Sequence, residues 1–219
     1  AFGASTSTGA GLKYVADNGF AVSTTVNSKK AASTKGFLTN EDESKINTQV
    51  AYTADNYHLS ATYSRQQGWN SWSYYSTKDL YTNADALTSD SDSVALRAWW
   101  RPEETGTATP SISVGYDTMS FSGRTDVAEG SGYFVGLNWA NMFQPDDRIG
   151  IALGQPMKAT KAAAGATLSE VDPFLWEVYY SFRPNDSIEV TPAIFGGNDV
   201  EDSTADDIFG AVLTTTFKF

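Results

Sequence analysis

The chain has 219 residues, no cysteine and a formal net charge of -11, with 26 acidic residues against 15 lysines and arginines. The acidic balance argues against nucleic acid as a partner, and the lack of cysteine excludes disulfide bonds and cysteine-ligated metal centres. No segment reaches the roughly 18 apolar residues of a membrane-spanning helix. The charged fraction of 19% is low for a soluble domain, and the aromatic fraction of 13% is high.

Alternating apolar and polar residues predict an all-β chain, and helical spacing is nowhere convincing. Side chains of a strand alternate between two faces, so a period of two marks a strand with one apolar face. In "FLWEVYYSF", for example, Phe174, Trp176 and Val178 fall on one face, whereas Leu175 and Glu177 fall on the other. In chain order, the predicted strands cover 9–17, 19–27, 45–54, 57–66, 92–101, 110–120, 131–142, 147–156, 172–183, 186–196 and 206–219.

The connections between these strands are predicted to alternate strictly between short turns and long polar loops. Gly, Pro, Asn and Asp mark turns because they tolerate or pre-set turn dihedrals. The turn signals are "ADNG" at 16–19, "ADNY" at 54–57, "QPDD" at 144–147, "RPND" at 183–186 and a longer "RPEETGTATP" at 101–110. The loops are predicted at 28–44, 67–91, 121–130, 157–171 and 197–205. Short turns at one end and long loops at the other are typical of antiparallel transmembrane β-barrels.

Aromatic residues near the strand ends support the same interpretation. They are Tyr14, Phe20, Tyr52, Tyr57, Trp100, Trp139, Phe143, Phe182, Phe217 and Phe219. Membrane barrels carry aromatic girdles at both water interfaces, and they must close because hydrocarbon tolerates no unpaired backbone edge. The pattern therefore favours a barrel with its apolar face toward lipid and its polar face toward a lumen. A soluble β-sandwich or solenoid is the alternative.

The polar face collects the residues that could line a pore. The predicted pore-lining set is Lys13, His58, Arg97, Arg101, Asp117, Arg148, Glu177, Arg183 and Glu189, and Lys218 shares their face. Charges that line a constriction set the selectivity of a channel, so the basic excess could form a cationic filter. The same arginines could instead hold inward-folded acidic loops by charge-assisted hydrogen bonds. Both interpretations stay open.

No residues form a plausible catalytic set, and no cofactor or metal site is predicted. The single histidine, His58, is interpreted as a polar group of the pore wall because no catalytic partner lies near it in the sequence. The acidic segments "TSDSDS" (88–93) and "DVEDSTADD" (199–207) lack the regular ligand spacing of a calcium loop and are predicted to be solvated. The aromatic segment "GWNSWSYY" (68–75) could stack on sugars, or it could pack into the barrel mouth or against a neighbouring subunit.

The C-terminal region resembles a known family. The segments "FLWEVYYSFRPNDSIEVTPAIF" and "DDIFGAVLTTTFKF" are similar to the end of cyanobacterial outer-membrane porins of the carbohydrate-selective, or iron-uptake, family. The resemblance covers about 172–219, and upstream only the strand rhythm matches. It implies a trimeric barrel of about sixteen strands. It also implies a signal peptide and an N-terminal domain that grips peptidoglycan or another wall polymer.

Strand parity predicts that N-terminal strands are missing from this sequence. If the last strand ends at the periplasm, the first of the predicted strands also runs downward, whereas bacterial barrels usually have an even number of strands. With about sixteen strands in the family, about five would be absent, together with the wall-binding domain. The alternative is one misdivided segment in a complete barrel of about twelve strands.

The expected function is passive diffusion of small hydrophilic solutes and inorganic ions across the outer membrane, with no catalytic step. The expected partners are outer-membrane lipid, two further copies in a homotrimer, and a wall polymer through the absent domain. Two other functions are alternatives. One is a structural envelope protein that anchors the outer membrane to the wall, and the other is a soluble carbohydrate-binding β-protein.

Overall fold

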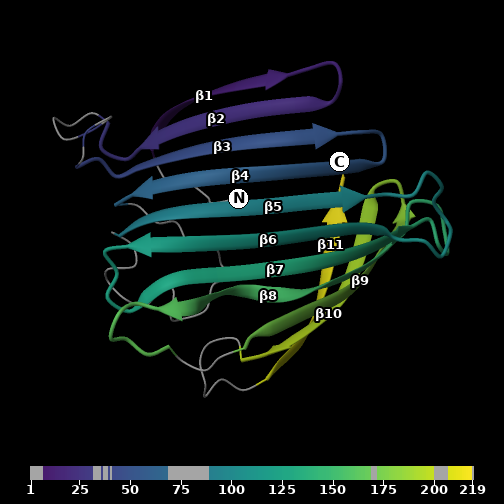
Figure 1. The fold of residues 1–219 in the computed structure, drawn as a ribbon. Coiled ribbons are helices and arrows are strands. Elements are labelled where there is room, and N and C mark those ends of the chain that lie inside the picture. Colours follow the sequence, from purple (N-terminus) through teal and green to yellow (C-terminus); the bar gives the residue numbers. More distant parts are fainter. Residues whose placement is uncertain are drawn as a thin grey trace.

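The computed structural model describes residues 7–31, 36, 39, 41–68, 89–168, 172–199 and 207–218, and these residues form one antiparallel sheet of eleven strands (Figure 1). The described residues contain no helix long and apolar enough to cross a membrane. The strands are β1 (Thr8–Val15), β2 (Phe20–Ser28), β3 (Ser44–Thr53), β4 (Tyr57–Gln67), β5 (Asp90–Trp100), β6 (Ser111–Ser122), β7 (Val127–Ala140), β8 (Arg148–Ala162), β9 (Phe174–Asn185), β10 (Ile188–Asn198) and β11 (Ile208–Phe217). The predicted all-β antiparallel fold is therefore confirmed strand by strand.

Each strand pairs with its neighbours in sequence, so the sheet is an uninterrupted meander from β1 to β11. The connections after β1, β3, β5, β7 and β9 lie at one end of the strands, which is called the turn end below (Figure 1). The other connections lie at the opposite end, called the loop end. Among the described residues β1 and β11 each pair on one side only, and the sheet is not closed.

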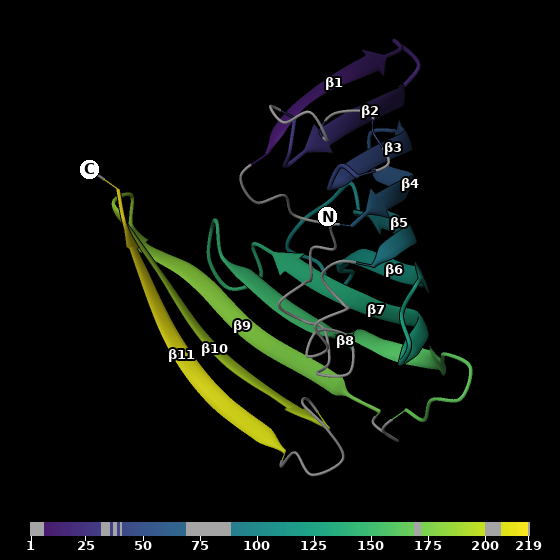
Figure 2. The ribbon, with the colours of Figure 1, turned by 90° about the vertical axis from the view of Figure 1, so that its left-hand side faces the viewer.

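The sheet is strongly curved rather than flat. Viewed along the strands, β1 to β8 form one wall, and β9 to β11 turn away from it to form a second wall (Figure 2). Successive strands of a sheet twist in a fixed hand, and this rotation accumulates over many strands into a curled surface. The result is an open trough.

The pairing register separates the side chains into two faces. Directly paired residues project to the same side of a sheet. One unbroken row therefore runs through Tyr52, Leu59, Ala98, Val114, Val135, Leu153 and Trp176 on seven neighbouring strands. We call this side the apolar face. The adjacent row on the opposite side, called the polar face, contains Thr53, His58, Trp99, Ser113, Gly136, Ala152 and Glu177.

Apolar side chains are exposed on the apolar face, whereas many side chains of the polar face are buried. This is the reverse of the distribution in a soluble protein. Large apolar side chains of the apolar face are open to the surroundings, including Leu59 at 52% and Leu96 at 46%. The buried side chains within strands lie mostly on the polar face, among them Ala51, Lys45, Ser64, Gln66, Ser91, Ser93, Ala95 and Met119. Because side chains converge on the inside of a curved sheet, we infer that the polar face is the concave one.

The strict alternation of short turns and long loops is corrected by the structure. The loop predicted at 121–130 is reduced to 123–126, because β7 begins at Val127 and pairs with an extended β8 that ends at Ala162. The register of this pair shifts between Val127 and Tyr133, and such irregularities break the period of two that marks a strand in the sequence. Conversely, the connection at 101–110 is long although it lies at the turn end.

Three segments singled out in the sequence are placed only in part. The acidic segment at 88–93 contributes to a strand, because β5 begins at Asp90 and Asp92 pairs with Arg65 across the sheet. Nearly all of the aromatic segment at 68–75 and most of the acidic segment at 199–207 lie outside the described residues, as does Phe219.

Candidate pore-lining face

The predicted pore-lining residues share the polar face. The register or strand alternation places Lys13, His58, Arg97, Asp117, Arg148, Glu177, Arg183 and Glu189 there. Arg101 follows β5 directly, and its guanidinium carbon lies 5.4 Å from the ring centroid of Trp99, which is a residue of the polar face. The nine residues come from seven strands and one strand end, so they are distributed over the face rather than gathered into one cluster.

The first group on this face is an ion pair between β5 and β6. Arg97 Nη2 donates to both carboxylate oxygens of Asp117, at 2.8 and 2.7 Å. Its Nη1 donates to the carbonyl of Leu96 at 2.8 Å, and the guanidinium carbon lies 5.3 Å from the ring centroid of Phe134. The two charged side chains are 29% and 22% exposed. The carboxylate of Asp117 therefore largely neutralises the positive charge of Arg97.

A glycine makes room for this arrangement. Gly115 pairs directly with both Arg97 and Phe134, and a Cβ atom at Gly115 would lie 2.2 Å from the Phe134 ring. The Phe134 ring therefore occupies the space that a side chain at position 115 would need. Tyr179 approaches Gly150 in the same way, at 2.0 Å from the corresponding Cβ position. Glycines of the polar face thus allow aromatic rings to approach the backbone closely.

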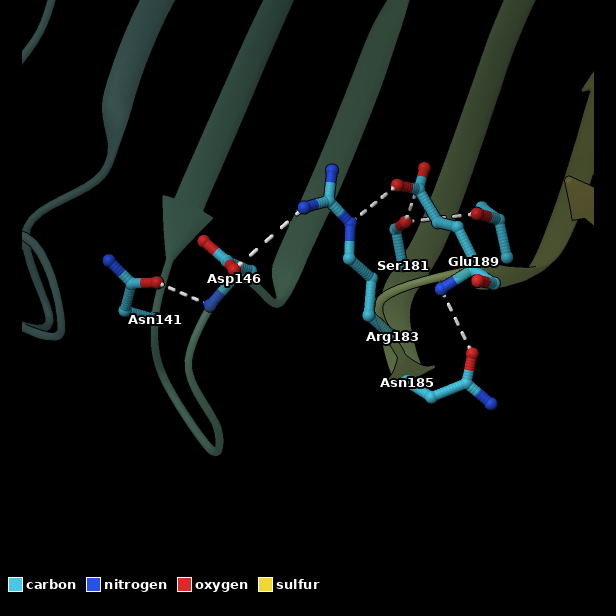
Figure 3. Close-up of polar contacts among 8 residues, drawn as sticks. Asn141, Asp146, Ser181, Arg183, Asn185 and Glu189 are labelled. Atoms are coloured by element: carbon cyan, nitrogen blue, oxygen red, sulfur yellow. Dashed lines mark hydrogen bonds and ion pairs between the residues drawn. The ribbon is translucent and has the colours of Figure 1, made fainter. Parts of the chain in front are cut away.

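The second group links β9 and β10 to the turn between β7 and β8 (Figure 3). Arg183 Nε donates to Glu189 at 3.0 Å, and Arg183 Nη1 lies 3.8 Å from Asp146. Ser181 Oγ also donates to Glu189, at 3.3 Å. Asn141 accepts the backbone N–H of Asp146 at 2.8 Å. Arg183 is therefore compensated by two carboxylates, and sequence parity alone had given no sign of the contact with Asp146.

The same turn contains a buried carboxylate that the sequence analysis did not single out. Asp147 accepts the backbone N–H groups of Met142 at 2.7 Å, Phe143 at 2.9 Å and Gln144 at 3.1 Å, and the hydroxyl of Tyr180 at 3.0 Å. Burial raises the pKa of Asp147, but the donors of Phe143 and Met142 outweigh it and hold the pKa below its ordinary value. The "QPDD" signal predicted a turn without showing which aspartate organises it.

A third group lies at the turn end of β4 and β5. The ring of His58 is parallel to that of Trp99, with centroids 6.0 Å apart and an interplanar angle of 7°. Nδ1 of His58 lies 2.8 Å from the Thr53 hydroxyl. The carbonyl of Asp55 accepts two N–H groups of Arg101, at 3.1 and 2.7 Å. His58 therefore has local polar and stacking partners, and its role as a wall residue stays a prediction.

The remaining charges of the set have no ion-pair partner among the residues that the structure describes. Within the described ranges, no oppositely charged group lies within ion-pair distance of Lys13, Arg101, Arg148 or Glu177. Three of these four charges are positive. Across the same part of the chain, no group of three acidic or histidine side chains could hold a metal ion.

Charged residues also occur on the apolar face, but only toward the loop end. Arg65 Nη1 donates to Asp92 at 2.7 Å, and the hydroxyl of Tyr63 donates to the same carboxylate. Farther along the rim, Lys161 pairs with Glu129, and Lys158 donates to Asp172 at 2.7 Å, which lowers the pKa of Asp172. Strand alternation alone does not predict these charged residues, because it assigns a residue to a face without showing where along the strand the apolar band ends.

The opposite edge of the apolar face is aromatic. Tyr14, Phe20, Tyr52, Tyr57 and Trp100 share this face at the turn end of five neighbouring strands, as the register shows. Tyr52 and Tyr57 are in contact, with ring centroids 5.8 Å apart. The apolar band is therefore bounded by aromatic rings on one side and by ion pairs on the other.

Comparison with known proteins gives one distant relative. Over 138 residues, the chain is 32% identical to the uncharacterized protein alr4550 of Nostoc sp.. The matched stretch is 63% of this chain but only 23% of that protein, so the chain spans less than a quarter of the length of this relative. No protein-family model matches the chain.

Proposed function

We propose that the chain is the barrel part of an outer-membrane porin through which small hydrophilic solutes and ions diffuse. The observation that carries this proposal is the separation of the two faces across all eleven strands. Most of the large exposed apolar side chains lie on one face, while charges and hydroxyls gather on the concave face, where only a few apolar residues such as Phe134 and Val212 are exposed among the described residues. In a soluble sandwich a second layer would cover the apolar side chains, whereas lipid covers them in a membrane barrel.

The limits of the apolar band support a bilayer as the covering phase. Aromatic rings at one membrane interface and charged groups beyond the hydrocarbon region are the arrangement that the two sides of a bilayer stabilise. An extended apolar surface of this kind also disfavours the soluble carbohydrate-binding alternative, because soluble proteins rarely expose contiguous apolar patches above a few hundred Å².

The open edges of β1 and β11 require partners in this proposal. An unpaired strand edge in hydrocarbon would leave its backbone N–H and C=O groups unsatisfied. We propose that further strands of the same polypeptide complete the barrel. The trimeric state, the barrel of about sixteen strands and the wall-binding domain remain predictions from the resemblance to cyanobacterial porins.

The proposal is tested by measuring conductance of the full-length protein in planar lipid bilayers. Stepwise current increases in KCl, with a conductance proportional to salt concentration, are expected from a water-filled pore. A protein that inserts into liposomes but gives no conductance would contradict the porin function and favour the structural envelope role. A protein that remains monodisperse in buffer without detergent would contradict the membrane location as well.

A further inference from the structure

A small recess lies beside the wall residues at the turn end of β5, β6 and β7. It has a volume of about 270 Å³ and is lined by Trp99, Trp100, Arg101, Ser111, Ile112, Ser113 and Asn138. All of these except Trp100 and Ile112 belong to the polar face or continue its alternation. The recess therefore opens toward the proposed lumen and combines an indole ring, a guanidinium group, two hydroxyls and an amide.

Arg101 carries an uncompensated positive charge in this recess. Its two described hydrogen bonds go to a single neutral acceptor, the carbonyl oxygen of Asp55. The Trp99 ring lies beside the guanidinium group and limits its freedom, as a cation–π contact does. Within the described ranges no carboxylate lies within ion-pair distance of Arg101. By contrast, Arg97 and Arg183 on the same face are both paired.

The other polar groups of the recess retain hydrogen-bonding capacity. Asn138 uses one N–H to reach the Tyr179 hydroxyl at 2.9 Å, so its second N–H and its carbonyl oxygen are not engaged in that bond. The Ser113 hydroxyl has only a long contact of 3.5 Å, to the carbonyl of Gly136. An acidic ligand held by Arg101 would thus meet additional donors on the neighbouring strands.

The recess is also fixed in shape by the long connection at 101–110. The N–H of Gly106 donates to the carbonyl of Ala140 at 2.8 Å, and the amide of Asn141 donates to the Thr105 hydroxyl at 2.8 Å. The indole N–H of Trp139 reaches the carbonyl of Ala108, also at 2.8 Å. This connection is therefore fastened to the end of β7 and to the turn that follows it. A preformed site loses less conformational freedom on binding.

We propose that this recess is a binding subsite for small organic carboxylates with an apolar body. The planar fork of a guanidinium group matches a carboxylate, while the indole wall accepts the apolar part of the solute. The recess combines apolar surface with a few polar groups, as small-molecule sites commonly do. A role of this subsite in solute passage rests on the proposed porin function, whereas binding of a carboxylate in the recess does not.

The experiment uses the full-length protein in detergent micelles, with sodium benzoate as the probe and benzyl alcohol as its neutral counterpart. Isothermal titration calorimetry and intrinsic tryptophan fluorescence report binding of each probe to the wild type. The variants are Arg101→Gln, which removes the charge, and Arg101→Lys, which keeps the charge but loses the planar fork. Arg65→Gln, on the apolar face near the loop end, is the charge-matched control.

Saturable benzoate binding is expected, with at least about tenfold weaker affinity in Arg101→Gln because a charge-assisted hydrogen bond is lost. Arg101→Lys should lie between this variant and the wild type, and Arg65→Gln should bind as the wild type does. Equal affinity for benzoate and benzyl alcohol would overturn the proposal without relying on any variant. Equal weakening in Arg65→Gln and Arg101→Gln would also overturn it, because the effect would then be a general one of net charge.

Conductance of the same preparations separates this inference from the proposed function. A conducting channel that does not bind benzoate would eliminate the subsite alone. Selective benzoate binding to a protein that conducts no ions would eliminate the porin function alone and leave a carboxylate-binding site on the concave face.

Discussion

The two faces of the sheet are made from alternate residues of the same strands, yet they differ in where charged side chains occur and in whether these are paired. On the apolar face, charged side chains occur only toward the loop end, where Arg65 pairs with Asp92. On the polar face, charges occur from β1 to β10, and some of them have no ion-pair partner among the described residues. The difference is the one expected if lipid covers the apolar face and water fills the space beside the polar face, as proposed above, because an unpaired charge is inexpensive only where water reaches it.

This comparison also shows that burial is a poor guide to chemical character in such a sheet. Lys45 is fully buried on the polar face, whereas Leu12 is 79% exposed on the apolar face. In a soluble domain, the expected distribution is the reverse. The inverted pattern is explained if curvature crowds the concave face and lipid, rather than protein, covers the convex one.

The largest expected effect comes from placing the same charge on each face at neighbouring positions. Ala61 and Thr62 lie next to each other near the middle of β4, with Ala61 on the apolar face and Thr62 on the polar face. Ala61→Arg should destabilise the folded barrel by about 2–4 kcal/mol if lipid contacts this face at the membrane midplane. The free energy is measured by urea unfolding in liposomes.

Thr62→Arg is the matched control for that experiment. The change removes a hydrogen bond from Gln49 to the Thr62 hydroxyl, at 3.0 Å, but leaves the new charge in water. We expect a loss of about 1 kcal/mol or less for this single exposed hydrogen bond. If Thr62→Arg lowers the free energy of unfolding as much as Ala61→Arg does, the experiment assigns lipid to neither face. If Thr62→Arg lowers it more, lipid contacts the polar face rather than the apolar one.

The next effect concerns the ion pair of the polar face. Arg97→Gln leaves the Asp117 carboxylate, which is 22% exposed, without its principal donor. We expect a loss of about 1–2 kcal/mol, between the values for exposed and buried pairs. The double variant Arg97→Gln with Asp117→Asn should recover part of this loss, since no unpaired charge remains. Urea unfolding of the single and double variants gives the coupling energy, and strictly additive losses would mean that the pair contributes nothing specific.

The strand pattern could be predicted from the sequence because successive side chains of a strand project to opposite faces of the sheet. Apolar and polar residues alternate when the two faces differ in character, and this alternation identified every strand that the structure describes. It failed at the ends of β7 and β8, where the register shifts and side chains no longer alternate regularly. Closure of the barrel depends on pairing between distant strands and could not be tested by local pattern.

The candidate site was predictable as a face but not as a set of contacts. Parity placed Arg97 and Glu189 correctly, because the face of a residue depends only on its position in the strand. It could not show that Arg97 is neutralised by Asp117, whereas the guanidinium of Arg101 donates its described hydrogen bonds to a backbone carbonyl. Those differences depend on rotamers and on the path of the connection at 101–110. Likewise, nothing in the local sequence distinguishes the buried Asp147 from its exposed neighbour, Asp146.

That neighbouring pair allows a test confined to one turn. The folded pKa of Asp147 lies below its ordinary value of 3.8. Its stabilisation of the turn is therefore complete above that value and is lost as the pH falls through the lower folded pKa. Asp147→Asn should loosen the turn even at neutral pH, because an amide cannot accept all of the backbone N–H groups that Asp147 accepts.

Proteolysis at Phe143, which is 76% exposed, measures this loosening. Chymotrypsin at pH 7 should cleave after Phe143 faster in Asp147→Asn than in the wild type. In the wild type, pepsin should cleave there with increasing rate as the pH is lowered below the ordinary carboxyl pKa. Asp146→Asn is the control and should be cut at the wild-type rate. Equal sensitivity of the two variants would show that Asp147 is not the residue that holds the turn.

The smallest expected effect is on ion selectivity, and it separates the paired from the unpaired charges of the polar face. Arg148 has no ion-pair partner in the described part of the chain, so Arg148→Gln removes one exposed positive charge from the proposed lumen wall. The reversal potential in a KCl gradient should shift toward cations. The shift should grow at low salt, because screening extends over about 8 Å at physiological ionic strength and about 30 Å at 0.01 M. The double variant Arg97→Gln with Asp117→Asn removes one charge of each sign and should shift the potential little. If the double variant moves the reversal potential as far as Arg148→Gln does, the ion pair lies at the narrowest section and the unpaired arginine does not set selectivity.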